Sequence, residues 1–181
     1  MFLETEPYML NEDTHLLCIL ELDPVLKRHA SNFLLYGGIL VGHSDGHFTL
    51  EELAYLSESL SPLFDTPDVL MKALLSPDMA VLSFEKSMGW LKQNGREVNH
   101  SLLRCLSGLA AADHMLRTEE VRFIQNTSRG LGIPSADGRY ILAQALAAKR
   151  AQLSRKQNIY RHTMPLYCFP STQSRGFQQS I

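Results

Sequence analysis

Apolar residues recur at three- and four-residue intervals along most of the chain, which is the spacing of one buried face of an α-helix. The clearest run covers about residues 24–42, where Leu26, His29, Phe33 and Tyr36 fall on one face. No segment shows the sustained alternation of a strand. The pattern therefore predicts an all-α fold, a compact bundle of about seven to eight helices.

Local signals place the ends of these helices. Pro24 can open a helix after Asp23, and Thr49 and Glu52 have the spacing of a capping box, in which each satisfies a free amide of the other. The Gly37–Gly38 pair predicts close packing against a neighbouring helix. We expect helices over about residues 14–22, 24–42, 50–63, 67–74, 77–94, 98–112, 118–131 and 135–153.

The charge divides the chain into a body and an end. Residues 1–138 hold 10 basic and 19 acidic side chains, whereas residues 139–181 hold 7 basic and no acidic ones, so a formal net charge of −2 hides this asymmetry. Such asymmetry is typical of interaction tails. We expect an N-terminal extension with a short helix (1–23), a helical domain (24–153) and a basic C-terminal tail (154–181) that is mobile or docks.

Other bulk features favour a cytoplasmic protein without a transmembrane segment. The longest apolar stretch, residues 33–42, is about half of the ~20 residues that a membrane span requires. The first residues are acidic and lack the basic start of a secretory signal. Cys18, Cys105 and Cys168 are odd in number and widely spaced, which favours buried or free thiols over a disulfide framework.

Two segments, residues 40–53 and 108–121, match each other without gaps. Each reads as an apolar helix that ends at an acid, a short turn, and a Glu-Glu pair that opens the next helix. The repeat predicts a pseudo-twofold pair of helix–turn–helix units. An offset of 68 residues aligns the acids of the two copies: Asp45, Glu51 and Glu52 with Asp113, Glu119 and Glu120.

The two aspartates are harder to explain than the four glutamates. Glutamates in a first turn gain about 0.3–1 kcal/mol each from the helix dipole. Asp45 and Asp113 instead fall at helix C-termini, where that dipole disfavours an anion. Carboxylates brought together there would need a cation, a shared proton or a basic side chain. The six acids are therefore candidate ligands of a divalent metal ion, with ordinary capping and solvation as the alternative.

Two other kinds of metal site, each made by a single turn, match the sequence only in part. Gly46 and Glu52 fit the glycine and the last glutamate of an EF-hand loop, but the first ligand position would fall on Val41, which cannot coordinate calcium. His43, Asp45 and His47 are close in sequence, but alternate residues at a helix end do not reliably face one point, so solvated turn histidines explain them better than a transition-metal site does. His29 lies on an apolar face and is expected to be a hydrogen-bonded core residue.

The chain resembles the TerB-like family, the helical domain of tellurite-resistance TerB proteins, and is similar to the N-terminal region of certain membrane-anchored DnaJ-type co-chaperones. The resemblance covers about residues 33–153. It rests on Asp45-Gly46 with Glu51-Glu52, and on the alanines 110–112 before Asp113 with Glu119-Glu120. It implies a helical bundle with internal repeats, a divalent metal held by the six acids, and a stress-linked sensor or adaptor role. His114 departs from the pattern, where glycine is expected.

Enzyme signatures such as HExxH, GxSxG, GxxxxGK[ST] and GxGxxG do not occur, so we expect a non-enzymatic protein. Two hypotheses remain: a metal-responsive module that uses the doubled acids, and a protein-interaction module that uses the basic end, with the acids only structural. The basic end, with its interleaved aromatic residues, could dock on an acidic protein partner or contact an anionic membrane surface peripherally. No recognised nucleic-acid motif is present, so a nucleic-acid partner is not expected.

Overall fold

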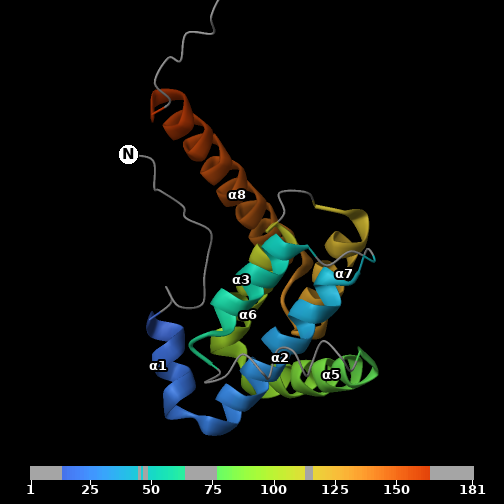
Figure 1. Ribbon diagram of the computed structural model, residues 1–181. Helices are drawn as coiled ribbons and strands as arrows, with labels where there is room; N and C mark the ends of the chain where they lie inside the picture. The colour runs from blue at the N-terminus through green and yellow to red at the C-terminus, as the bar shows by residue number, and fades with distance from the viewer. Residues whose placement is uncertain (1–13, 45, 47–48, 64–76, 113–115, 164–181) are drawn as a thin grey trace, which may run out of the picture.

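The described part of the chain is entirely helical. The structure is a computed structural model that describes residues 14–44, 46, 49–63, 77–112 and 116–163. Seven helices account for almost all of these residues (Figure 1): α1 (Thr14–Leu22), α2 (Pro24–Gly42), α3 (Leu50–Leu60), α5 (Pro77–Asn94), α6 (Arg96–Ala110), α7 (Thr118–Gly130) and α8 (Ser135–Thr163). The predicted all-α class is confirmed.

The helices start where the sequence signals them. Asp23 is the N-cap of α2, and its Oδ1 accepts hydrogen bonds from the amides of Val25 (2.9 Å) and Leu26 (3.0 Å). Pro24 follows at the first helical position, where its missing N–H costs nothing. The helix predicted over about residues 67–74 lies outside the described residues.

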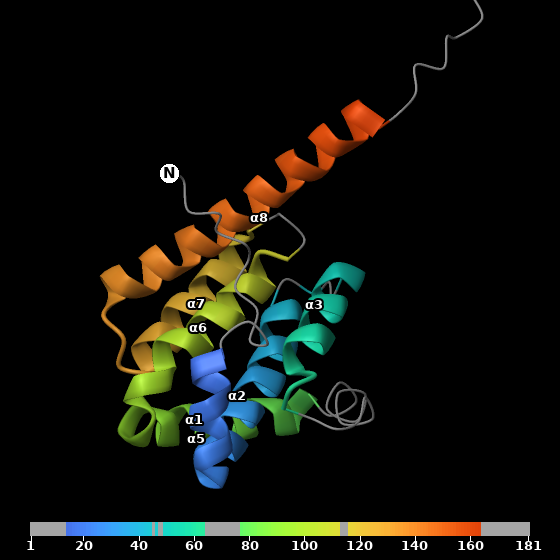
Figure 2. The ribbon, with the colours of Figure 1, turned by 90° about the vertical axis from the view of Figure 1, so that its left-hand side faces the viewer.

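Helix α2 lies at the centre of the molecule and contacts α1, α3, α5, α6 and α7 (Figures 1 and 2). The predicted close approach at its glycine pair is confirmed. A Cβ on Gly37 would lie 2.6 Å from Cε2 of Phe84 in α5, and one on Gly38 would overlap Leu56 of α3. Since the two glycines have no side chain, Phe84 and Leu56 pack directly against the backbone of α2, which is covered by α5 and α3 at this point.

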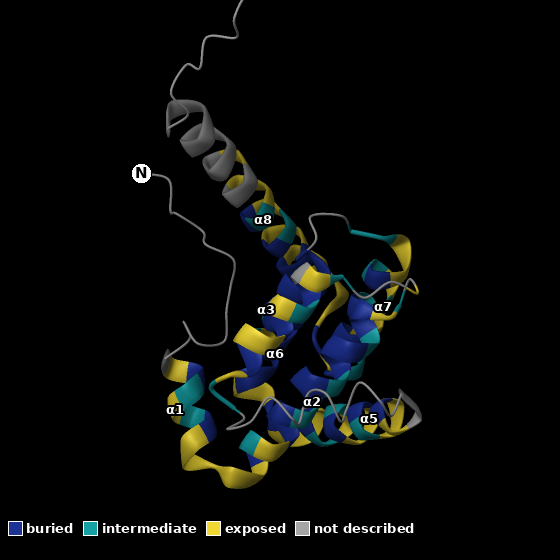
Figure 3. Cartoon of the chain, in the orientation of Figure 1, coloured by how far each residue is buried: buried dark blue, intermediate teal, exposed yellow. Residues whose placement is uncertain are grey.

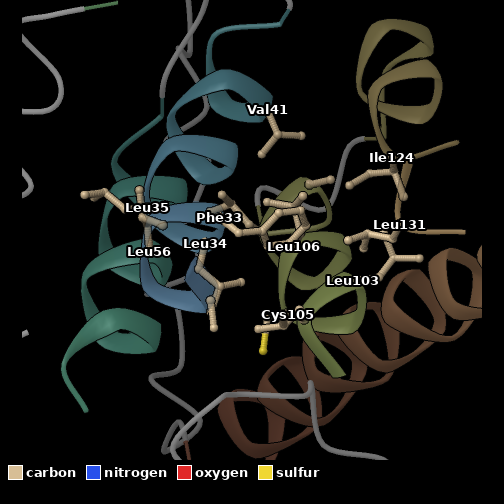
Figure 4. Close-up of a cluster of buried hydrophobic side chains, with 14 of the residues drawn as sticks. Phe33, Leu34, Leu35, Val41, Leu56, Leu103, Cys105, Leu106, Ile124 and Leu131 are labelled. Atoms are coloured by element: carbon tan, nitrogen blue, oxygen red, sulfur yellow. The ribbon is translucent and has the colours of Figure 1, made fainter. Parts of the chain in front are cut away.

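The core lies between α2, α6 and the helices around them (Figures 3 and 4). Phe33 of α2, Leu103 of α6 and Ile124 of α7 are completely buried. The ring of Phe84 stacks between Phe33 (5.1 Å between centroids) and Phe123 (5.5 Å), so aromatic contacts join α2, α5 and α7. One continuous apolar core therefore holds the described helices together.

Helix α8 is longer than the sequence predicts, because it continues past Leu153 to Thr163. Its first half packs on α6 and α7, and its second half extends away from the other helices (Figures 1 and 2). The first ten residues of the predicted basic tail, 154–163, therefore form a projecting arm of α8. Residues 164–181 lie outside the described residues.

Candidate functional site

The first acidic turn joins α2 to α3. Helix α2 ends at Gly42, and Gly46 adopts a positive φ of 83° in the turn that follows. Thr49 then caps α3 with the predicted capping box: its hydroxyl accepts from the amide of Glu52 (3.2 Å), while Glu52 Oε2 accepts from the Thr49 amide (2.7 Å) and hydroxyl (2.9 Å). Glu52 is 2% exposed, so this buried carboxylate is satisfied within its own turn.

The second acidic turn joins α6 to α7. Glu120 is also 2% exposed, and its Oε2 accepts from the backbone amide of Arg117 at 2.7 Å. This is the glutamate half of a capping box. Arg117 has no acceptor with which to complete the box, unlike Thr49. Glu119, in the same first turn of α7, is exposed.

The two turns place their equivalent glutamates in the same way. Glu52 and Glu120 are both the third residue of their helix, both buried, and both bonded to the backbone three residues earlier. Capping therefore explains these two acids without a metal. Asp45, Asp113 and the side chain of Glu51 lie outside the described residues, so the gathering of six acids stays a prediction, as does the internal repeat.

No group of three or more His, Cys, Asp or Glu side chains within the described ranges is arranged to hold a metal ion. Of the histidines considered with Asp45, His43 is exposed, and His47 lies outside the described residues. The metal assignment therefore rests on the sequence and on the family resemblance.

His29 is buried as predicted, but an aromatic stack holds it. Its ring lies 4.4 Å from the ring of Trp90, nearly parallel at 10°. Its Nδ1 is buried and has no hydrogen-bond partner among the described residues, so the expected hydrogen bond is absent there. Burial lowers the pKa of His29 from its ordinary value of 6.5, and the nearby charges of Arg28 and Lys86 lower it further.

The two described cysteines, Cys18 and Cys105, are free thiols. Cys105 is buried in α6, which agrees with the expectation of a helix-buried cysteine, and Cys18 is exposed. Cys168 lies outside the described residues. Neither described thiol has a position that suggests a nucleophile, because Cys105 is closed in by apolar side chains of the core.

One basic feature was missed at the level of sequence. Lys92, Arg96 and His100 line a hollow of about 490 Å³ beside the turn from α7 to α8. The four-residue spacing of Arg96 and His100 within α6 could have indicated a shared face for these two, but Lys92 lies in α5, on the other side of Gly95. The opposite wall comes from residues 131–134, which are distant in sequence, so only the fold reveals the hollow.

Comparison with known proteins gives no relative: no family model, no curated protein and no solved structure matches the chain. The TerB-like resemblance consequently stays a prediction. Among the described helices, none combines the length and the apolar character needed to cross a membrane.

Proposed function

We propose that the chain is a non-enzymatic adaptor module that binds an acidic protein partner through the basic, projecting end of α8. The observation that carries the proposal is the length of α8. This helix continues to Thr163 and leaves the body of the molecule, instead of ending where its packing ends (Figure 2). A helix that extends from its domain offers surface for a partner helix or groove.

Charge defines the chemistry of that partner. After Asp137 the chain contains no acidic residue, and the outer part of α8 carries Lys149, Arg150, Arg155, Lys156 and Arg161. Clustered positive charge steers the approach of an acidic surface and is not neutralised by acids of its own segment. An acidic protein surface is therefore the complementary partner.

The arm also has an apolar component. Positions 149, 153, 156 and 160 follow at intervals of four, three and four residues, so they lie along one line of α8, and Leu153 and Tyr160 are two of them. Near the body, Lys149 lies over the ring of Tyr55 in α3, 4.7 Å from its centroid. This contact anchors the base of the arm. A mixed basic and apolar line suits a protein groove.

A pull-down at increasing salt concentration tests the proposal. Full-length protein should capture a partner at low salt and lose it near 1 M salt, where the Debye length is about 3 Å. Arg155→Gln/Lys156→Gln/Arg161→Gln should lose the partner, whereas Lys27→Gln/Lys86→Gln/Arg122→Gln, with the same change of charge on the body, should keep it. Equal capture and equal salt sensitivity in the two triple variants would contradict the proposal.

A second experiment uses anionic lipid vesicles in place of a protein partner. A membrane surface would bind the basic arm through the same charges. Binding of the full-length protein to phosphatidylserine vesicles, with loss in the same triple variant and no protein captured, would assign the arm to a membrane and not to a protein. Vesicles that fail to bind while a protein is captured would support the adaptor proposal.

The second candidate function is metal sensing by the doubled acidic turns. Its support is the doubled acid pattern of the sequence, together with the like placement of Glu52 and Glu120 in the two turns; the capping bonds of these two glutamates do not themselves require a metal. Thermal unfolding with calcium, magnesium, manganese or zinc, against chelator, tests it. A ligand at 100 times its Kd stabilises by about 2.7 kcal/mol. If the unfolding temperature of the wild type does not change with metal, metal binding is contradicted. An increase of the same size in Asp45→Asn/Asp113→Asn would also contradict it. Glu85→Gln/Glu97→Gln, which removes two acids outside the turns, is the control and should respond to metal as the wild type does.

A further inference from the structure

We infer that the hollow between the α5–α6 junction and the α7–α8 turn is a binding site for the phosphate group of a small molecule. Lys92, Arg96 and His100 line one side of the hollow, and residues 131–134 line the other. The inference is independent of the arm of α8, because that helix contributes no residue to the hollow.

The hollow is lined by basic residues, although the part of the chain that contains them is acidic overall. Residues 1–138 carry nine more acidic than basic side chains, yet none of the residues that line the hollow is acidic. Lys92, Arg96 and His100 are exposed, and among the described residues no Asp or Glu lines the hollow beside them. Three basic groups that share one concavity without a carboxylate favour an anionic ligand.

The frame of the hollow is fixed by buried contacts. Asn99 is 3% exposed, and its Nδ2 donates to the carbonyl oxygens of Leu91 (3.1 Å) and Leu131 (3.3 Å). One side chain thus ties the end of α5 to the end of α7. Because both bonds are buried, they hold the two walls at a constant separation.

The turn that forms the far wall depends on glycine. Gly132 has a φ of 76°, which is the left-handed region, and its amide donates to the Arg129 carbonyl at 3.1 Å as the chain leaves α7. A Cβ on Gly132 would lie 3.7 Å from Cγ of Lys92. The aliphatic stem of Lys92 therefore lies beside the turn, and Lys92 is one of the residues that line the hollow.

Size and charge together select the ligand class. A hollow of about 490 Å³ falls within the range of about 300–1,000 Å³ that is usual for small-molecule sites. A phosphate monoester carries about −1.5 to −2 charges near neutral pH and offers three acceptor oxygens. Arginine binds such oxygens in a planar fork, and lysine binds them as a point charge. Arg96 and Lys92 together therefore suit a doubly charged phosphate better than they suit an anion with a single charge.

Amide chemical-shift titration of the full-length protein tests the site. The ligands are inorganic phosphate, pyrophosphate and glycerol phosphate, each against chloride at equal ionic strength. We expect saturable shifts confined to residues around 92–100 and 131–134. Tighter binding of free phosphate would identify the ion itself as the ligand, and tighter binding of the ester would identify a phosphorylated small molecule; either result supports the site.

Matched variants separate a site from general electrostatic attraction. Lys92→Gln/Arg96→Gln should weaken binding at least about tenfold, because it removes the lysine and arginine side chains that would donate charge-assisted hydrogen bonds to the phosphate. Arg122→Gln/Arg150→Gln removes the same charge at exposed positions about 12 Å along α7 and about 22 Å along α8 from the α7–α8 turn. It should leave affinity within about twofold, since exposed charges at such separations are largely screened. His100→Gln changes one exposed residue and should lower the affinity for phosphate by less than the double variant does. It tests the site even if the double variant does not fold. Shifts that do not saturate, an equal effect of chloride, or equal affinities of the two double variants would overturn the inference.

Discussion

At the scale of single residues, Gly37 is required by the packing of α2. A Cβ there would lie 2.6 Å from Phe84, which is buried and stacks on both Phe33 and Phe123, so moving its ring would disturb two aromatic contacts. Gly37→Ala should destabilise the protein by about 1–2 kcal/mol, because overpacking costs more than the ~1 kcal/mol gained in helix propensity. Urea unfolding of the variant and the wild type measures the difference.

Gly89 provides the matched control for that substitution. It lies in α5, is exposed, and a Cβ added to it would meet no atom within 4 Å. Gly89→Ala should therefore stabilise the protein by up to ~1 kcal/mol, since only helix propensity changes. Equal effects of the two glycine substitutions would contradict the close packing of α2 on α5.

His29 makes stability depend on pH. Its pKa in the folded protein is lowered from 6.5, first by burial and then by Arg28 and Lys86, so folding favours the neutral ring. This contribution is fully present above pH 6.5 and is lost as pH falls from 6.5 through the lowered folded pKa. We expect the free energy of unfolding of the wild type to decrease over that interval.

The variant His29→Phe isolates this effect, because phenylalanine keeps a ring against Trp90 and removes the titrating group. The difference in unfolding free energy between wild type and variant should change between pH 7.5 and 5.5, with the wild type losing more. A constant difference between wild type and His29→Phe would show that His29 does not titrate differently on folding.

At the scale of secondary-structure elements, the capping box of α3 is expected to contribute through local hydrogen bonds alone. Thr49→Ala removes the acceptor of the Glu52 amide and should destabilise the protein by about 1 kcal/mol. The loss should be the same with a divalent cation or with chelator present, because the bonds join only Thr49 and Glu52. Chemical denaturation under both conditions measures it.

Thr118 is the comparison residue in the second turn. It is exposed and occupies the first position of α7, after the cap residue Arg117, so its hydroxyl does not cap the helix. Thr118→Ala should change stability by less than ~0.5 kcal/mol. A loss from Thr49→Ala that appears only with metal would instead connect the first turn to the metal-sensing candidate.

Helix starts were predictable from sequence because they depend on neighbours in the chain. Asp23, Thr49 and Pro77 each carry a local signal, and the helices begin beside them. The length of α8 was not predictable from apolar periodicity, because residues 154–163 extend beyond the body and need no buried face. Once a helix is established, each added residue avoids the cost of nucleation, so α8 can continue without packing.

The same distinction applies to the candidate sites. The capping of Glu52 follows from its spacing to Thr49, whereas the hollow beside the α7–α8 turn depends on contacts between distant segments. Asn99, for example, reaches Leu131 across 32 residues of sequence, and this bond joins the walls. Spacing could identify Arg96 and His100 as neighbours on α6, but Lys92 belongs to α5, and no spacing could place the α7–α8 turn beside them.

At the scale of the whole molecule, the opposed charges occupy different structural parts. The acidic excess belongs to the chain up to residue 138, which supplies six of the seven described helices and only the first residues of α8. The basic residues that follow lie mainly on α8, partly where it packs on α6 and α7 and partly on its projecting arm. Body and arm are thus physically separate enough to engage different ligands.

This separation predicts the order in which trypsin cleaves the folded protein. The arm extends from the body, and short helices without tertiary packing are marginal in water, so it should open with a low free energy. Cleavage after Arg155, Lys156 and Arg161 should therefore precede cleavage after Arg104, which lies within α6 in the core. Mass spectrometry of timed digests identifies the sites. If cleavage after Arg104 occurs at the same time, the arm and the body unfold together and the prediction is wrong. If a captured acidic partner protects the arm from cleavage, its binding surface lies on α8.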